Sequence, residues 1–345
     1  MRCILRLLVL FASLPITQAI AADDDGVMGI WEGKFTTPGW ESRTLKAKIW
    51  GVKSGMWDGV LTVFDKDTVD GEGKISDDNQ DKTFAFTGVV SLDGEYFVTA
   101  TANEGTMRGE LTPGRESKKG TIKPSRKSGA PAAFELKRVQ VKPPSLGAAP
   151  PEGAIVLLAP GKELDAWIAD PPKWGRTAEG GMQVSNPRLI TTQEFGSCKI
   201  HLEFVTPYMP NEGVGSQARG NSGVYVQGRY EIQVLDSFGA APQNNLCGGI
   251  YKIAAPLADA VLPPLTVQTY DIEFHAPKFD AQGKKTSDAE LTALHNGVLV
   301  HDRLKLPNAT PGGVSEVEAP TGPLLLQHHG DPVEYRNIWI QPIQE

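Results

Sequence analysis

The sequence predicts an all-β protein in two parts: a small antiparallel β barrel or sandwich, followed by a concanavalin-like two-sheet jelly roll. Three observations support this prediction. Short runs that alternate apolar and polar residues recur along the chain, and almost nothing has the period of a long amphipathic helix. The 37 glycines and 26 prolines among 345 residues supply frequent turn signals. Between the two β-rich regions, residues 142–152 are rich in proline and predict a semi-rigid extended linker.

The composition and the charge narrow the class of protein. Hydrophobic residues make up 40% and charged residues 22% of the chain, as is typical of a globular protein. The formal net charge is −7. Because an acidic chain has no net positive field to attract a polyanion, we expect no nucleic-acid partner.

The first 21 residues predict a secretory signal peptide. Arg2 and Arg6 flank the start of a short apolar stretch, and residues 19–21 (Ala-Ile-Ala) form a small-x-small end. We expect cleavage after Ala21, with Ala22 as the alternative. Neither this stretch nor any later one is long enough to span a bilayer. We therefore expect an exported protein, periplasmic or extracellular, without an integral membrane segment once the signal is removed.

The first β-rich part covers residues 24–141. Residues 45–50 alternate apolar and polar side chains, and residues 92–94 form a hairpin-turn signal. Further strands are expected at 59–64, 83–91, 95–102 and 132–140. We expect its four tryptophans in the core rather than on a sugar-stacking face: Trp31, Trp40, Trp50 and Trp57. This part contains no histidine and no constellation of reactive groups, so we expect residues 153–345 to retain most of the activity alone.

The second β-rich part covers residues 153–345. Strands are expected at 198–205, 223–235, 270–276, 290–296, 324–328 and 333–340. Two cysteines, Cys198 and Cys247, remain after signal removal. Two small buried hydrophobic side chains are the simplest interpretation. A disulfide, which an oxidising compartment permits, and a reactive or metal-bound thiol are the alternatives.

The densest pattern of polar residues lies in residues 219–237, where two predicted strands meet at Gln227-Gly228. Alternation on the second strand places Glu231 and Gln233 on one face. A carboxylate and an amide on one face are costly to bury without partners, and they suit a groove that holds a polyhydroxylated ligand. Asp236 has the opposite parity and joins this face only if a bulge or the strand end turns it.

Two other interpretations of this strand stay open. Glu231 could form a structural ion pair with Arg229 or Arg336 across strands. The pattern Glu-x-Gln-x-x-Asp is also superficially similar to the Glu-x-Asp-x-x-Glu strand of retaining glycosidases with this jelly roll. Because Gln233 cannot ionise, it weakens the case for ordinary two-carboxylate hydrolysis.

All six histidines lie in the second part. Alternation places Gln327 and His329 on one strand face, with His328 on the other. An imidazole titrates near neutral pH, so His329 is a candidate general base or metal ligand. The alternative is a hydrogen-bonded structural histidine. No His-x-His or His-x-x-x-His spacing is present, which weakens a histidine-based metal site.

Seven motifs follow one another in the second part: Asn221-Ser-Gly-Val-Tyr225, Tyr230-Glu-Ile-Gln-Val-Leu-Asp236, Gly249-Ile-Tyr251, Gln268-Thr-Tyr-Asp-Ile-Glu-Phe274, Asn296-Gly-Val298, Gly322-Pro-Leu-Leu-Leu-Gln327 and Arg336-Asn-Ile-Trp339. Through them, about residues 153–345 resemble the 3-keto-disaccharide hydrolase family. It is also described as a 3-keto-glucoside 1,2-lyase and 3-keto-2-hydroxyglucal hydratase domain. The resemblance implies a concanavalin-like jelly roll, export, and a carbohydrate substrate, a glycoside already oxidised at sugar C3.

The chemistry that the resemblance implies needs a base at C2, a donor for the enolate oxygen and an acid for the leaving oxygen. Glu231 is the candidate base, and His329 or Asp236 is the candidate acid. A divalent cation could replace the cationic donor, and the sequence establishes no cofactor. The candidates for binding substrate are Asn221, Tyr225, Arg229, Gln233, Gln327 and Arg336.

The chain departs from the family pattern in three places. It has Leu157-Leu-Ala-Pro160 where members often carry Leu-Phe-Asp-Gly, and Val267 where a Trp is common. His328 replaces a frequent Asp beside His329, so the activity, pH optimum or substrate could differ. A non-catalytic glycan-binding jelly roll and an ordinary two-carboxylate glycosidase are the competing hypotheses.

Overall fold

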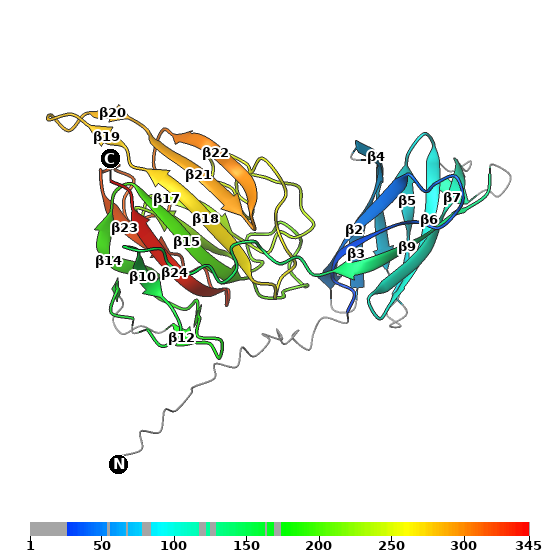
Figure 1. Ribbon diagram of the computed structural model, residues 1–345, viewed down its shortest axis with the longest axis horizontal. Coiled ribbons are helices and arrows are strands. Elements are labelled where there is room, and N and C mark those ends of the chain that lie inside the picture. The colour runs from blue at the N-terminus through cyan, green and yellow to red at the C-terminus, as the bar shows by residue number, and fades with distance from the viewer. Residues whose placement is uncertain are drawn as a thin grey trace, which may run out of the picture.

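The computed structural model describes residues 26–53, 56–66, 68–77, 84–116, 122–124, 129–162, 164–168 and 174–344. The regular elements in these ranges are all strands, and they form two bodies (Figure 1), which confirms the all-β prediction. Within the same ranges, no helix is long and apolar enough to cross a membrane. The predicted signal peptide lies outside the described residues.

The first body is a closed antiparallel barrel of eight strands. It closes because the last strand pairs with both the first strand and β7, while β6 also pairs with β7. The short β8 (Ile122–Pro124) pairs antiparallel with the last residues of β7. The barrel strands are β1 (Gly29–Phe35), β2 (Arg43–Lys53), β3 (Met56–Asp65), β4 (Thr68–Asp77), β5 (Ala85–Ser91), β6 (Glu95–Asn103), β7 (Thr106–Glu116) and β9 (Ala132–Val139).

Alternate apolar side chains of β2 point into the barrel, in agreement with the predicted pattern of one buried face. Leu45, Ala47 and Ile49 are at most 2% exposed and belong to its apolar core. Trp31 and Trp57 lie in the same core, which confirms the core interpretation for these two tryptophans. Trp50 has the opposite parity and packs instead into the apolar core of the second body.

The second body contains two facing antiparallel sheets. Seven strands of the larger sheet follow in the order β12 (Gly175–Arg176), β13 (Met182–Gln183), β24 (Glu334–Pro342), β15 (Cys198–Val205), β18 (Gln268–His275), β21 (Ala289–His295) and β22 (Val298–Leu306), with β10 (Ile155–Leu158) also paired to β24. The smaller sheet has the order β11 (Trp167–Ile168), β14 (Leu189–Phe195), β23 (Gly322–Leu326), β16 (Ser222–Val226) and β17 (Tyr230–Val234). A short hairpin joins β19 (Lys278–Phe279) to β20 (Lys285–Ser287).

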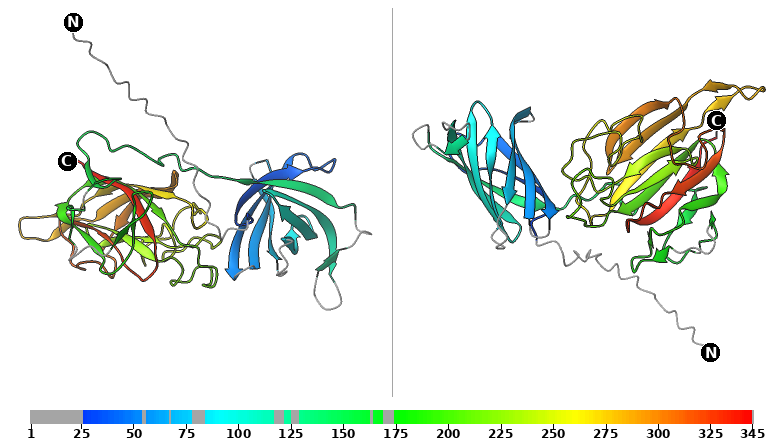
Figure 2. Two further views of the ribbon diagram at one scale, coloured as in Figure 1. Left: turned by 90° about the horizontal axis from the view of Figure 1, so that it is seen from below. Right: turned by 180° about the vertical axis from the view of Figure 1, so that it is seen from behind.

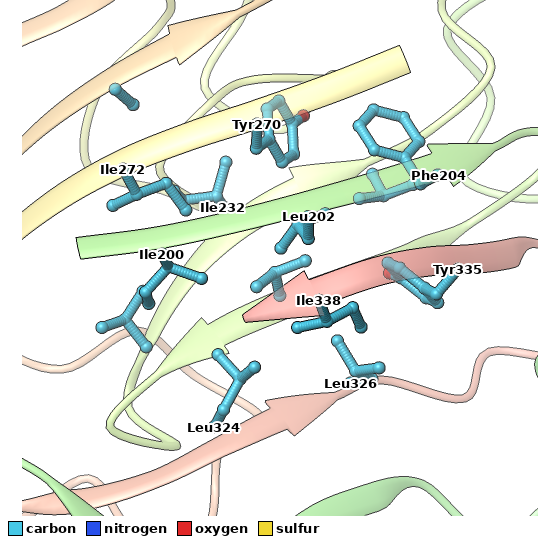
Figure 3. Close-up of a cluster of buried hydrophobic side chains, with 14 of the residues drawn as sticks. Ile200, Leu202, Phe204, Ile232, Tyr270, Ile272, Leu324, Leu326, Tyr335 and Ile338 are labelled. Atoms are coloured by element: carbon cyan, nitrogen blue, oxygen red, sulfur yellow. The ribbon is translucent and has the colours of Figure 1, made fainter. Parts of the chain in front are cut away.

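Apolar side chains from both sheets meet between them (Figure 3). Ile200 and Leu202 of β15 approach from the larger sheet, and Ile232 of β17 and Leu324 of β23 approach from the smaller one. Cys198 and Cys247 are free and buried, so the predicted alternative of a disulfide between them is not formed. Because β17 turns Ile232 toward this core, its neighbours Glu231 and Gln233 lie on the opposite face.

The proline-rich segment between the bodies packs on the outer face of the larger sheet (Figure 2). Ser145 Oγ donates to Asp271 Oδ2 at 2.5 Å, and the Gly147 amide donates to Glu203 Oε1 at 2.7 Å. The carbonyl of Ala148 accepts a hydrogen bond from Asn337 Nδ2 at 3.0 Å. These bonds hold the proline-rich segment against β18, β15 and β24 of the larger sheet.

Candidate functional site

The candidate site is built on the β16–β17 hairpin. Tyr225 lies directly opposite Glu231, and Gly223 lies opposite Gln233. Gln227 and Gly228 have φ angles of 52° and 62°, so the hairpin turns where the sequence predicts. Cross-strand partners share a face, which brings the Tyr225 phenol and the Glu231 carboxyl together on the side away from the inter-sheet core.

The Glu231 side chain is buried and closely packed. The residue is 2% exposed, and its backbone amide donates to Thr310 Oγ1 at 2.9 Å. Its Oε1 atom lies over Gly223, where the Cβ of any other residue would overlap it. A glycine at position 223 is therefore needed to leave room for this carboxyl.

The Tyr225 phenol can serve either protonation state of Glu231. Its oxygen lies 2.8 Å from Glu231 Oε2 and 3.0 Å from the Pro311 carbonyl. When Glu231 is ionised, Tyr225 can donate to the carboxylate. When Glu231 is protonated, the carboxyl can donate to Tyr225, which then donates to Pro311. The pair can thus gain or lose a proton without leaving a donor unpaired.

Burial raises the pKa of Glu231 to about 7, and the hydrogen bond from Tyr225 opposes that rise. A carboxyl with such a pKa is partly ionised at neutral pH and can both accept and return a proton. Perturbed carboxyls of this kind are concentrated at functional sites.

Three amide side chains lie near this hairpin, and one of them, Gln327, bonds to the pair. Gln327 Nε2 donates to the Tyr225 hydroxyl at 3.2 Å, Gln233 Nε2 donates to Gln217 Oε1 at 3.0 Å, and Asn221 Nδ2 donates to the Gln217 carbonyl at 2.7 Å. Their side-chain oxygens accept no hydrogen bond from the described residues. Buried acceptors without donors are costly, so this cluster suits a ligand that brings several hydroxyl groups.

The two candidate arginines are not brought to Glu231. Arg229 Nε donates to the Val317 carbonyl at 2.7 Å, and Arg336 lies on β24 of the larger sheet. Arg336 Nε is 2.7 Å from Glu334 Oε1. The described residues show no ion pair between Glu231 and either arginine, so the structural alternative for Glu231 is not observed.

Asp236 lies beyond the end of β17 and is 1% exposed. Arg219 Nε donates to its Oδ2 at 2.7 Å. Burial raises the pKa of Asp236, and the Arg219 guanidinium opposes that rise. This buried ion pair favours a structural role for Asp236 over a role as a proton donor.

His329 lies in the loop that follows β23. Because β23 ends at Leu326, the alternation that groups Gln327 with His329 does not extend that far. Gln327 and His328 are half-buried, whereas His329 is exposed. The loop is fixed beside β16, since Ser222 Oγ donates to the Gln327 carbonyl at 2.7 Å and the Asn221 amide donates to Asp331 Oδ2 at 2.7 Å.

Sequence reasoning missed the segment that covers Glu231. Thr310 is fully buried, and its hydroxyl donates to the Arg229 carbonyl at 2.8 Å. Arg188, directly before β14, donates from Nη1 to the Gly312 carbonyl at 3.1 Å and holds the same segment. The run Pro311-Gly-Gly313 is a loop signal, but no local pattern shows which strand it covers.

A second cluster of titratable groups lies under the proline-rich segment. His201 Nδ1 is 2.7 Å from Asp271 Oδ1, and its Nε2 is 3.6 Å from Glu203 Oε1. Burial lowers the pKa of His201, but the hydrogen bonds and charges of Asp271 and Glu203 outweigh it and hold the pKa above its usual value. Because the same carboxyls bind Ser145 and Gly147, this cluster anchors the segment.

In the described part of the chain, no group of three or more His, Cys, Asp or Glu side chains is arranged to hold a metal ion. Around Glu231, the neighbours that the hydrogen bonds define are a phenol, a hydroxyl and amides.

Comparisons with known proteins point to one family. The model of the 3-keto-alpha-glucoside-1,2-lyase-like domain matches residues 153–341, and no curated protein matches the chain. Three crystal structures from Parabacteroides distasonis ATCC 8503, each described as a candidate glycosyl hydrolase, are similar. The first is 29% identical with a TM-score of 0.49, covering 70% of this chain and 92% of its own. The others are 17% and 22% identical, with TM-scores of 0.41 and 0.39, and cover 56% and 55% of this chain and 95% and 99% of theirs.

Proposed function

Since the chain belongs to the 3-keto-alpha-glucoside-1,2-lyase-like family of carbohydrate-active enzymes, we propose that it cleaves 3-keto-glycosides by elimination and then hydrates the product. The observation that carries this proposal is the Glu231 carboxyl, which is buried beside Tyr225 with a pKa near 7. We also propose that residues 1–21 direct export, so that the enzyme acts in the periplasm or outside the cell.

The first step is removal of the C2 proton by ionised Glu231. The C3 ketone acidifies this proton, and the electrons of the C2–H bond form the C2–C3 double bond of an enolate. When the enolate collapses, the ketone re-forms, C1 and C2 become doubly bonded, and the C1–O bond to the aglycone breaks. The leaving oxygen takes a proton, for which His329 is the candidate donor.

Water then restores the sugar. Its oxygen adds to C1 of the enone, one of its protons goes to a base, and C2 regains a proton from protonated Glu231. The net reaction is hydrolysis of the glycoside, with no oxidant or reductant consumed. The pairing of Tyr225 with Glu231 and Pro311 supports this proposal, because it accommodates Glu231 in both protonation states.

The amides near the hairpin support a carbohydrate ligand. Within the described residues, the side-chain oxygens of Asn221, Gln233 and Gln327 have no hydrogen-bond donor. They can therefore accept hydrogen bonds from sugar hydroxyls. The Tyr225 proton is used by Glu231 or Pro311, whereas Gln327 Nε2 has a second N–H beyond the one that it gives to Tyr225, so we propose that the Gln327 amide stabilises the enolate oxygen.

Incubating the full-length protein with a 3-keto-glucoside and with its unoxidised parent glucoside tests the proposal. Elimination requires the C3 ketone, so only the keto compound should be turned over. Turnover of both compounds would instead indicate an ordinary two-carboxylate glycosidase. Binding without turnover of either would indicate a glycan-binding protein.

A further inference from the structure

One end of β2 makes part of the contact between the barrel and the second body, beside Ile30 of β1 and Trp57 of β3. Trp50 is 8% exposed and packs into the apolar core of the second body. Its ring lies so close to Gly239 that the Cβ of any other residue there would overlap it. Lys48 Nζ is 2.5 Å from Asp259 Oδ2 across the same junction. Packed side chains therefore hold the barrel against the second body, in addition to the covalent connection through the proline-rich segment.

A buried arginine lies at this junction. Arg219 is fully buried, and its Nε donates to Asp236 Oδ2 at 2.7 Å. Its Nη1 donates to the Glu212 carbonyl at 2.7 Å and to the Gly51 carbonyl of β2 at 3.2 Å. A buried guanidinium needs acceptors for its N–H groups, and the barrel supplies one of them.

Arg219 is linked to the candidate site by the segment 217–221. Gln217 Oε1 accepts from Gln233 Nε2 at 3.0 Å, and the Gln217 carbonyl accepts from Asn221 Nδ2 at 2.7 Å. The Asn221 amide in turn donates to Asp331 in the loop that carries His329. A displacement of Arg219 would therefore move two of the amides near the β16–β17 hairpin.

We propose that Arg219 is a positioning residue and that the docked barrel supplies an acceptor for its Nη1 group, so that Gln217, Asn221 and Gln233 are held for substrate only while the barrel is in place. The activity part of this inference rests on the proposed function. It reverses the sequence-based expectation that residues 153–345 retain most of the activity alone.

Trp50→Ala in the full-length protein tests the inference, with Trp40→Ala as the matched control. Trp40 is half-buried against Phe35 and Tyr96, before the start of β2, whereas Trp50 lies near its end. In Trp50→Ala, amide hydrogen exchange at residues 217–222 should accelerate about tenfold, and KM for a 3-keto-glucoside should rise by a similar factor. Trp40→Ala should change neither quantity.

Arg219→Lys provides the second variant. It keeps a positive charge beside Asp236 but loses the Nη1 group, which donates to both the Glu212 and the Gly51 carbonyls. Its effects on exchange and KM should resemble those of Trp50→Ala, and the double variant should show less than the sum. If Trp50→Ala does not fold, Lys48→Met, which removes the ion pair with Asp259, should cause the same change in exchange at lower amplitude.

Two results would overturn the inference: wild-type exchange at residues 217–222 in a folded interface variant, or additive effects in the double variant. Hydrogen exchange needs no substrate, which separates the two proposals. If exchange accelerates in the interface variants but the wild-type protein does not turn over 3-keto-glucosides, the proposed function is wrong. The role of the barrel in holding residues 217–222 is then still supported.

Discussion

Glu231→Gln should stabilise the protein at alkaline pH while removing its activity. A pKa of about 7 in the folded protein, against 4.5 for the ordinary group, makes ionisation of the folded protein costlier by about 3.5 kcal/mol, at about 1.4 kcal/mol per pH unit. Below pH 4.5 the carboxyl is protonated in both states and this cost is zero. Between pH 4.5 and 7 only the unfolded chain ionises, so stability falls, and above pH 7 the loss is constant.

The glutamine keeps the shape of the side chain and never ionises, so it escapes this loss. Urea unfolding of both proteins at pH 5 and pH 8 measures the difference. We expect the free energy of unfolding of the variant, relative to wild type, to rise by about 2.5 kcal/mol between these pH values.

The control is Glu316→Gln, the same chemical change at an exposed position. Its stability relative to wild type should change little between the two pH values. If Glu231→Gln behaves like this control, the carboxyl titrates normally and the argument from burial is wrong.

Three further predictions concern other groups. Tyr225→Phe removes a hydrogen bond that lowers the pKa of Glu231, so the rising limb of the kcat/KM profile should move up by about one pH unit; an unmoved limb would contradict the pairing. His201→Gln should cost about 2 kcal/mol at pH 6 and less at pH 9, because the raised pKa of His201 gives stability that is lost as pH rises through it; equal costs in urea unfolding would refute this. Burial raises the pKa of Cys198 to about 12 and of Cys247 to about 11, so a thiol reagent should label neither until the protein unfolds, and rapid labelling would show exposure.

Local periodicity was sufficient to predict much of the fold. The alternation at residues 45–50 matches the inward side chains of β2, and residues 198–205 form β15 with the predicted ends. The parity that separates Glu231 and Gln233 from Ile232 is also correct, because the alternation of polar and apolar residues shows it directly in the sequence, even though every residue of β17 is buried.

The long-range partners could not be predicted from the sequence. Arg336 bonds to Glu334 two residues away, and no pattern distinguishes that choice from a bond to Glu231. The docking of Trp50 on Gly239 and the bond from Gly147 to Glu203 join residues far apart in sequence, which periodicity does not report. For the same reason, the sequence did not predict that the segment around Thr310 covers Glu231.

Exchange of the substrate C2 proton in deuterated buffer tests the central claim most directly, since it detects proton removal even if cleavage is slow. With a 3-keto-glucoside, the full-length protein should catalyse deuterium incorporation at C2. NMR measures its rate, which should exceed the rate without the protein. Glu231→Gln should lower this rate by about 10²- to 10⁴-fold while Glu316→Gln retains it. A folded Glu231→Gln protein with wild-type exchange and turnover would remove Glu231 from the mechanism.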